Sequence, residues 1–353
     1  MPRANNLAPS QTLGKILMLG DPKAGKSDWA ARAAEAGFNV LYFDGDVAGQ
    51  TIAQLSDEAK SRIYYMDVSD QLVGDKDPRF IDTLTGFTTS TRYIWNDTKQ
   101  KEFSIKDGVN EEGFALDEIW EFRPSKLDHY WVFVLDSWTN LAMSGMLAKA
   151  NDSGVDLADI EKAERSMYQG TGNRLTQIAA TLQKFPCHVI TIGHPDQYEK
   201  RRSQDGKTVK EAMKETDQIV EWTKMVPKSS SRPHSLTLGK FFSDVGWIDV
   251  GKYGKRELDF TATSARVSGG HLNSKGDPRE SHSFANVVKS MGGFIPDGTQ
   301  DTGEALTIHP PGTYLAKKPA QVLGAKPASS STTPAAQPST VKGLGGLVGL
   351  KSR

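Results

Sequence analysis

Residues 20–27 read Gly-Asp-Pro-Lys-Ala-Gly-Lys-Ser and constrain the fold of this chain more than any other part of its sequence. They follow Lys15–Leu19, an apolar run with the length of a buried strand. They precede Ser27–Ala36, an alanine-rich segment that is typical of a helix. A glycine-rich loop between a strand and a helix matches the P-loop pattern, whose backbone N–H groups and helix N-terminus surround phosphates. The pattern predicts an α/β fold with a phosphate-binding loop.

Each residue type in this loop has a chemical use. Glycines at 20 and 25 let the backbone curl so that its N–H groups point inward. A lysine at 26 can reach the β- and γ-phosphates, and a serine hydroxyl at 27 can coordinate Mg²⁺. An ordinary turn could carry these letters by chance, but the flanking strand and helix favour the P-loop. We therefore expect ATP and Mg²⁺ as ligands, with nucleotide contacts from Gly20, Asp21, Pro22, Lys23, Ala24, Gly25, Lys26 and Ser27.

Further apolar runs extend the pattern along the chain. A second strand is predicted close behind the first helix, so the first two strands form a βαβ unit with parallel pairing. Later strands alternate with helical segments, which predicts a mainly parallel sheet flanked by helices. The predicted strands are Phe38–Phe43, Arg62–Met66, Trp131–Leu135, His188–Ile192, Val245–Val250 and Glu257–Thr261, and the later helices are Ser137–Ala150 and Leu157–Phe185.

Changes in composition mark the domain boundaries. We expect a polar lead-in over residues 1–12, an ATPase domain over 13–295 and a disordered Pro/Ala/Ser-rich tail over 296–353. An insertion at about 85–129 interrupts the domain, and two short runs in it, at 92–95 and 102–105, can pair as a hairpin. Its aromatic residues Tyr93 and Trp95 could stack on bases or form a small core.

Overall charge and cysteine content exclude some classes of protein. Lys plus Arg and Asp plus Glu are both 43, so any attraction to nucleic acid must come from a local patch. Cys187 is the only cysteine, which rules out an internal disulfide. No stretch approaches the roughly 18 apolar residues of a membrane span, and the amino terminus lacks a secretory apolar region. We expect a cytoplasmic protein, in the host cytoplasm if a phage encodes it, with no membrane partner.

Acidic and polar residues follow three of the predicted strands. Asp136 ends the run 132–135 and is the candidate Mg²⁺ ligand beside the loop serine, although it could instead cap the following helix. Asp46 is the first candidate for the base that activates water, and Asp44 is the second, although either could be an ordinary turn residue. His194 could sense the γ-phosphate, but a lone histidine is also often structural.

With these motifs, residues 13–270 resemble the RecA/RadA branch of P-loop ATPases. The resemblance is to the single-domain RecA-like proteins of bacteriophages that act in single-strand annealing recombination. It rests on the P-loop and on the runs Leu41–Asp46, Val132–Asp136 and Val189–His194. In that family a glutamate acts as catalytic base where Asp46 stands here, and a polar γ-phosphate sensor stands where His194 does.

The resemblance also implies a DNA-binding loop and a shared nucleotide site. The loop would be 197–232, and its phosphate contacts would be Lys200, Arg201, Arg202, Lys207 and Lys210. Proteins of this family commonly bind ATP between subunits, which implies a homo-oligomer in which a neighbour supplies a basic residue. The candidates, any of which could instead belong to a solvated basic turn, are Lys252, Lys255, Arg256 and Arg266.

Two functions from different classes follow. The first is an ATP-binding and ATP-hydrolysing protein that acts on single-stranded DNA in phage-type recombination, repair or replication. The second is a nucleotide-gated protein-interaction module that hydrolyses ATP slowly and recruits replication proteins through the insertion and the tail. A helicase or packaging-type motor is less favoured, because the sequence holds no separate second motor domain.

Overall fold

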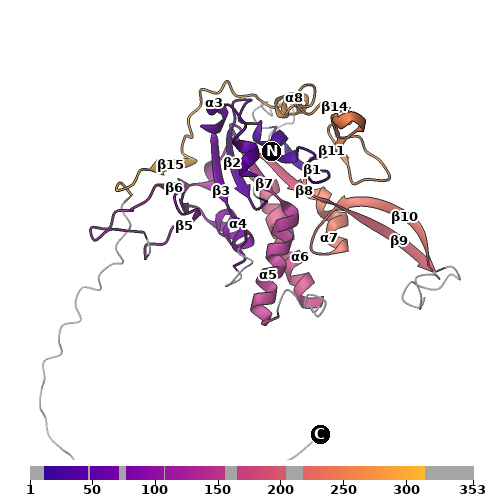
Figure 1. The fold of residues 1–353 in the computed structure, drawn as a ribbon, viewed down its shortest axis with the longest axis horizontal. Helices are drawn as coiled ribbons and strands as arrows, with labels where there is room; N and C mark the ends of the chain where they lie inside the picture. Colours follow the sequence, from indigo (N-terminus) through magenta and orange to yellow (C-terminus); the bar gives the residue numbers. More distant parts are fainter. Residues whose placement is uncertain are drawn as a thin grey trace, which may run out of the picture. The chain divides into compact units, whose positions relative to one another are not determined.

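The computed structural model describes residues 12–46, 48–70, 77–106, 108–155, 165–203 and 218–314. Its main sheet has the strand order β14-β12-β11-β1-β8-β7-β2-β3 (Figure 1). The parallel strands are β1 (Lys15–Leu19), β2 (Asn39–Asp44), β3 (Ile63–Asp67), β7 (Trp131–Asp136), β8 (His188–Gly193) and β11 (Asp244–Val250). The antiparallel additions are β12 (Arg256–Asp259), β13 (Gly269–Gly270) and β14 (Lys275–Gly276). The predicted α/β fold with a mainly parallel sheet is confirmed.

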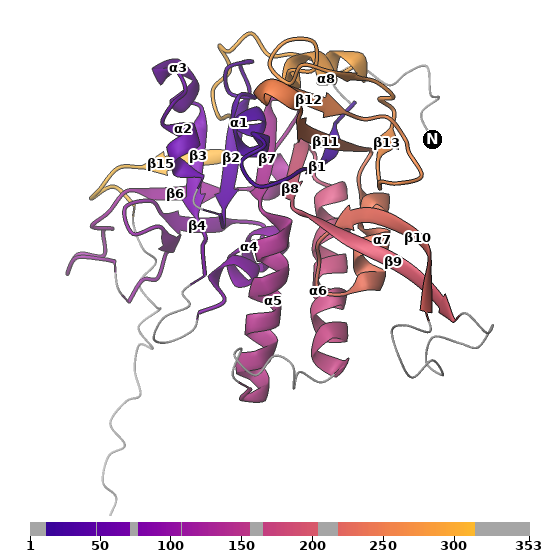
Figure 2. The same cartoon turned by 45° about the vertical axis from the view of Figure 1, so that its right-hand side comes forward.

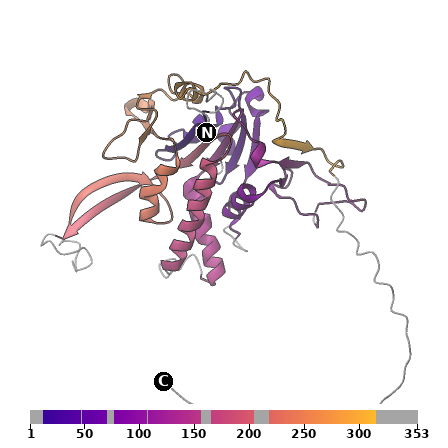
Figure 3. The ribbon, with the colours of Figure 1, turned by 180° about the vertical axis from the view of Figure 1, so that it is seen from behind.

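Helices cover both faces of this sheet (Figures 2 and 3). Side chains alternate along a strand, so Leu17 and Leu19 of β1 join one core and Ile16 and Met18 join the other. The first core is closed by α4 (Arg79–Thr89), α5 (Trp138–Ser153) and α6 (Arg165–Gln183), and the second by α1 (Lys26–Ala31) and α8 (Phe284–Ser290). Burial on both faces explains why these strands read as continuous apolar runs. The described chain also contains six short helices: α2 (Gly49–Ile52), α3 (Asp57–Lys60), α7 (Arg232–Thr237), η3 (Pro124–Lys126), η6 (Leu238–Phe241) and η7 (Lys252–Gly254).

The predicted direct pairing of the first two strands is wrong. β1 pairs with β8 and β11, and both β8 and β7 lie between β1 and β2. The predicted first helix is also too long, because α1 ends at Ala31 and turns continue to Gly37. Every residue of β1 and β2 is buried. The apolar character of the predicted strands therefore could not indicate which of them pair with each other.

The insertion forms a small sheet with a segment from the end of the described chain. Its order is β15 (Leu306–His309), β6 (Ile119–Phe122), β4 (Tyr93–Asn96) and β5 (Lys101–Glu102). The predicted hairpin is confirmed, since Trp95 pairs with Glu102. Of the two alternatives for Tyr93 and Trp95, packing in a core is confirmed and stacking on bases is not, because their exposed fractions are 1% and 0% and both belong to the first core.

The prediction that the tail begins at residue 296 is also wrong. Leu306 of β15 is buried and pairs with Phe122 of β6, so the ordered chain reaches at least residue 314. A strand this short is stable only when it pairs with other strands, and its partner here is distant in sequence. The local composition around residue 306 gives no information about that partner. Residues 1–11 and 315–353, which hold most of the predicted lead-in and tail, lie outside the described residues.

The loop predicted over residues 197–232 is wrong as a conformation, because the described chain after β8 forms a long hairpin. Strand β9 (Pro195–Ser203) pairs with β10 (Gln218–Pro227), and the two extend away from the body of the molecule (Figures 1 and 2). The predicted DNA contacts Lys200, Arg201 and Arg202 are consecutive residues of β9, and Arg201 pairs with Val220 of β10. The other two, Lys207 and Lys210, lie outside the described residues.

None of the helices in the described ranges is long and apolar enough to cross a bilayer.

A buried histidine gives the fold a specific pH dependence. His188 at the start of β8 is 1% exposed, and its Nδ1 accepts a hydrogen bond of 3.0 Å from the Gly14 backbone N–H. Burial lowers the pKa of His188 from 6.5 to about 3. Below pH 6.5 the unfolded chain therefore binds a proton that the native state does not, and the free energy of unfolding falls as the pH falls towards 3.

We expect His188 to contribute a loss of about 1 kcal/mol in the free energy of unfolding between pH 7 and pH 5.5. Replacing it in His188→Gln should flatten the stability profile over this range, because glutamine does not titrate. Denaturant unfolding at several pH values measures the slope. As a control, Thr191→Val changes another buried residue of β8 that does not titrate and should keep the wild-type slope. Equal slopes for wild type and His188→Gln would contradict the assignment.

Candidate functional site

The loop between β1 and α1 has the backbone geometry that its glycines predict. Gly20 has φ +151° and Gly25 has φ +100°, backbone values that residues other than glycine rarely adopt. A Cβ at Gly20 would also lie 2.3 Å from the Ile248 carbonyl oxygen of β11. The loop therefore lies in close contact with β11. Positive φ requires glycine at both positions, and the contact with β11 also leaves no room for a side chain at Gly20.

Lys26 is held by the loop itself. Its Nζ donates hydrogen bonds of 2.9 Å to the Gly20 carbonyl and 2.8 Å to the Asp21 carbonyl, and the side chain is buried. Burial lowers the pKa of Lys26, while the nearby carboxylates of Asp136 and Asp46 oppose that shift. The ammonium therefore lies at the loop, beside the acids of the neighbouring strands, where a bound phosphate would meet it.

Asp136 meets Ser27 where β7 ends. The Ser27 hydroxyl donates a 2.6 Å hydrogen bond to Asp136 Oδ2, and the Tyr42 hydroxyl donates one of 2.7 Å to the same oxygen. Burial raises the pKa of Asp136 to about 6. Its Oδ1 is buried, and no hydrogen-bond partner within the described part of the chain reaches it. The alternative cap role belongs to Ser137, whose side chain accepts from the Asn140 N–H at the start of α5.

This pair fits a magnesium site. Mg²⁺ prefers oxygen ligands, and the structure brings together a hydroxyl, a carboxylate and an oxygen without a partner. A cation would also offset the cost of burying the ionised carboxylate, which is the cause of its raised pKa.

Asp46 lies in a turn just beyond β2 and faces His194, which follows β8. The Asp46 Oδ2 and His194 Nε2 are 3.4 Å apart, and Asn140 Nδ2 donates a 3.1 Å hydrogen bond to Asp46 Oδ1. The hydrogen bond from His194 is the largest cause of the lowered pKa of Asp46. With its side chain 42% exposed, Asp46 is an ionised carboxylate open to water.

Asp44, the second candidate base, has a different position. It is fully buried, and its oxygens accept hydrogen bonds from the Asp46 N–H at 2.8 Å, the Ala48 N–H at 2.5 Å and the Tyr65 hydroxyl at 2.6 Å. Asp44 therefore shapes the turn that presents Asp46, and its engaged oxygens do not suit it to activate water.

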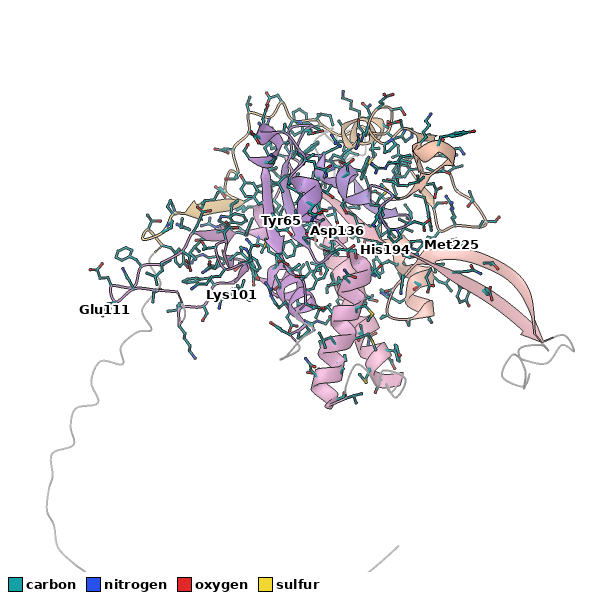
Figure 4. The ribbon with its side chains drawn as sticks, in the orientation of Figure 1. Tyr65, Lys101, Glu111, Asp136, His194 and Met225 are labelled. Carbon is teal, nitrogen blue, oxygen red and sulfur yellow. The ribbon has the colours of Figure 1, made fainter. Side chains whose placement is uncertain are left out.

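A single cleft of about 430 Å³ joins these groups. Figure 4 shows Asp136 and His194 close together near the centre of the molecule, with Met225 beyond them at the base of the hairpin. The cleft is lined by Pro22, Lys23, Gly25, Lys26, Ser27, Asp28, Asp46, Thr51, Gln54, Asp136, His194, Arg256 and Arg279. The structure thus brings together the P-loop and the three polar residues predicted at strand ends.

Several residues of this site were missed by the sequence analysis. Tyr42 and Asn140 contact the two aspartates, but nothing in their local sequence marks them. Asp28 and Arg279 also line the cleft, and only the position of Asp28 directly after the P-loop offered a signal.

The four basic residues predicted as candidates to complete the site of a neighbouring subunit lie in different surroundings. Arg256 lies in the cleft of its own chain, and Lys255 lines an adjoining hollow. Arg266 pairs with Asp249 at 2.6 Å and lies 4.9 Å from the centre of the Trp247 ring. The side chain of Lys252 is outside the described residues.

The position of Lys26 leads to a direct test. Lys26→Ala should weaken binding of Mg²⁺–ATP by about a hundredfold or more, because it removes the cation that the loop carbonyls hold beside the phosphates. Calorimetric titration measures the affinity, and thermal unfolding checks that the variant folds. Lys60→Ala, a surface lysine paired with Asp57, is the control and should bind like wild type. Unchanged affinity in a folded Lys26→Ala protein would contradict the P-loop assignment.

Comparison with known proteins agrees with this geometry. No curated protein matches the chain. Residues 14–269 match the model of a family described as an AAA domain, and the matched range, which is well over half of the chain, includes the P-loop, Asp46, Asp136 and His194. A loop built to hold phosphates and a match of this extent lead to one conclusion: the chain belongs to the AAA-domain family of P-loop ATPases.

Proposed function

We propose that this protein binds and hydrolyses ATP with Mg²⁺ and couples the nucleotide to single-stranded DNA, acting in phage-type recombination, repair or replication as a RecA-like homo-oligomer. The observation that carries the proposal is the position of His194. It contacts Asp46 in the nucleotide cleft, and the next residue begins the projecting hairpin.

The cleft offers the groups that hydrolysis needs. Lys26 supplies positive charge beside the phosphates, and Ser27 and Asp136 would hold Mg²⁺, which when bound neutralises phosphate charge. Asp46 is ionised and open to water, so it can accept a proton from the attacking water, while His194 and Asn140 fix its orientation. An aspartate is shorter than the glutamate of RecA-like proteins, so its reach to that water depends on the turn that Asp44 holds.

Backbone contacts of His194 connect the cleft to both ends of the hairpin. Its N–H donates a 3.0 Å hydrogen bond to the Thr139 hydroxyl at the start of α5, and its carbonyl accepts a 2.8 Å hydrogen bond from the Lys228 N–H just after β10. Trp138, two residues beyond Asp136, donates a 3.1 Å hydrogen bond from its indole N–H to the Ser229 hydroxyl. Hydrolysis or exchange of the nucleotide could therefore alter the position of the hairpin through these contacts of His194 and Trp138.

The hairpin is suited to contact a phosphate backbone. Three consecutive basic residues of β9 lie at 200–202, on a two-stranded arm that leaves the body of the molecule. The formal net charge of the chain is zero, so a local group of this kind is what attraction to nucleic acid requires.

The base assignment leads to a prediction about turnover. Asp46→Asn should keep the affinity for ATP but lower the hydrolysis rate by about a hundredfold or more, because the amide cannot accept a proton. Steady-state phosphate release, paired with ATP binding, measures the two effects. The control is Asp46→Glu, which restores the acid of the RecA-like family and should hydrolyse ATP. If Asp46→Asn turns over like wild type, another group activates the water.

The hairpin assignment leads to a prediction about DNA. Alanine at Lys200, Arg201 and Arg202 together should weaken single-stranded DNA binding and reduce the slope of log affinity against log salt by about 0.7 for each phosphate contact that is lost. Fluorescence anisotropy with a labelled oligonucleotide at several salt concentrations measures both quantities. Wild type should also bind DNA more tightly with a non-hydrolysable ATP analogue than with ADP.

A second variant controls for loss of charge alone. Alanine at Lys126, Lys149 and Lys289, three basic residues away from the hairpin, removes the same charge and should leave the salt slope unchanged. If the hairpin variant matches this control and both nucleotides give equal DNA affinity, the hairpin is not a DNA site. The protein would then be a nucleotide-gated protein-interaction module that hydrolyses ATP slowly.

A further inference from the structure

Two arginines from the second half of the chain lie against the first turn of α1. Arg279 Nη2 is 3.0 Å from Asp28 Oδ2, and Arg256 Nη1 is 3.9 Å from the same oxygen. The Arg256 guanidinium also lies over the P-loop, since a Cβ at Gly25 would be 3.0 Å from it. Both arginines line the cleft that holds Lys26.

Positive charge exceeds negative charge at this point. The Asp28 carboxylate also pairs with Arg32, whose Nε is 3.0 Å away, so three guanidinium groups surround one carboxylate. Arg32 has a second acid in Glu35 at 2.7 Å. The side chains of Arg256 and Arg279 are 37% and 56% exposed, so both can reach a ligand in the cleft. Such an excess of cations beside a phosphate-binding loop favours a further anionic contact.

The direction of these residues indicates which part of a nucleotide they would meet. Successive residues of a helix point about 100° apart. Ser27 is directed to Asp136, whereas Asp28, the next residue, is directed to the two arginines. The reacting γ-phosphate belongs with Asp136 and Asp46, so the arginines lie towards the other end of the triphosphate.

A hollow next to the cleft continues in this direction. Arg256 and Arg279 line both spaces, and the hollow is completed by Gly25, Asp28, Trp29, Gly254, Lys255, Asp277 and Pro278. The segment that carries Arg279 is fixed to α1, because the Trp29 indole N–H donates a 2.8 Å hydrogen bond to the His282 carbonyl. The Trp29 ring also packs edge-on against Phe284, with 5.6 Å between ring centres. Arg279 lies outside the residues that match the family model.

We propose that Arg256 and Arg279 bind the α- and β-phosphates of a nucleotide in the P-loop of their own chain, and that the adjoining hollow receives the nucleoside. The inference rests on the proposed nucleotide binding and adds two residues of the same chain to it. Contacts at these phosphates are common to ATP and ADP, so the arginines contribute to affinity for both nucleotides.

The variants Arg256→Gln and Arg279→Gln test this assignment, because glutamine removes the charge but keeps a polar side chain. Each should weaken ADP and ATP alike by about tenfold or more, the value of one charge-assisted hydrogen bond. The KM for ATP in steady-state hydrolysis should rise by a similar factor. Calorimetric titration with each nucleotide and Mg²⁺, together with steady-state kinetics, measures these effects, and thermal unfolding verifies folding. Arg32→Gln is the matched control, because it also loses a guanidinium partner of Asp28 but does not line the cleft.

The possible outcomes separate this inference from the proposed function. If Lys26→Ala loses nucleotide while both arginine variants bind like wild type, the P-loop assignment stands and this inference is overturned. A loss confined to ATP would place the arginines at the γ-phosphate and overturn the α,β assignment. An equal loss in Arg32→Gln would mean that the arginines only support the fold. If the wild-type protein binds neither nucleotide, the proposed function itself fails.

Discussion

The parallel pairing of β1 with β8 on one side and β11 on the other is the constraint on which the site depends. Parallel strands end at the same edge of a sheet, so this order brings the P-loop, His194 and Asp136 to one place. The β11 neighbour matters equally, since its Ile248 carbonyl leaves no room for a side chain at Gly20. Both faces of β1 are buried, which keeps the loop on a rigid support.

Burial acts on two opposed charges in the cleft, those of Asp136 and Lys26. Burial raises the pKa of Asp136 and lowers that of Lys26, so each charged form is disfavoured by burial. Hydrogen bonds from Ser27 and Tyr42 offset part of the cost at Asp136, and the charges of Asp136, Asp46 and Asp21 offset part of it at Lys26. Asp46 differs because it is partly open to water and hydrogen-bonded, and its pKa is lowered. Two carboxylates a short distance apart are thus suited to different tasks by their surroundings: the buried one to a cation and the open one to a proton.

The second half of the chain surrounds the P-loop with two separate structures. The hairpin begins at Pro195, directly after His194, and leaves the body, whereas β12 and the segment after β14 return Arg256 and Arg279 to the first turn of α1. In the proposed function, the first would respond to the reacting end of a nucleotide and the second would hold its other end. Both depend on contacts with α1 or with the residues that follow β7 and β8.

The sequence by itself determined the P-loop, the strands that precede Asp46, Asp136 and His194, and the mainly parallel sheet. These features rest on local patterns: apolar runs for strands buried on both faces, and glycines where the backbone needs positive φ. Only the tertiary structure decided that β8 and β7 separate β1 from β2, that Tyr93 and Trp95 are core residues, and that β15 joins the insertion. It also decided that Asp44 is engaged by backbone N–H groups and that Arg256 and Arg279 reach Asp28. The physical reason is that pairing partners and ion pairs distant in the chain are chosen by packing, and local residue patterns carry no information about which distant residues will meet.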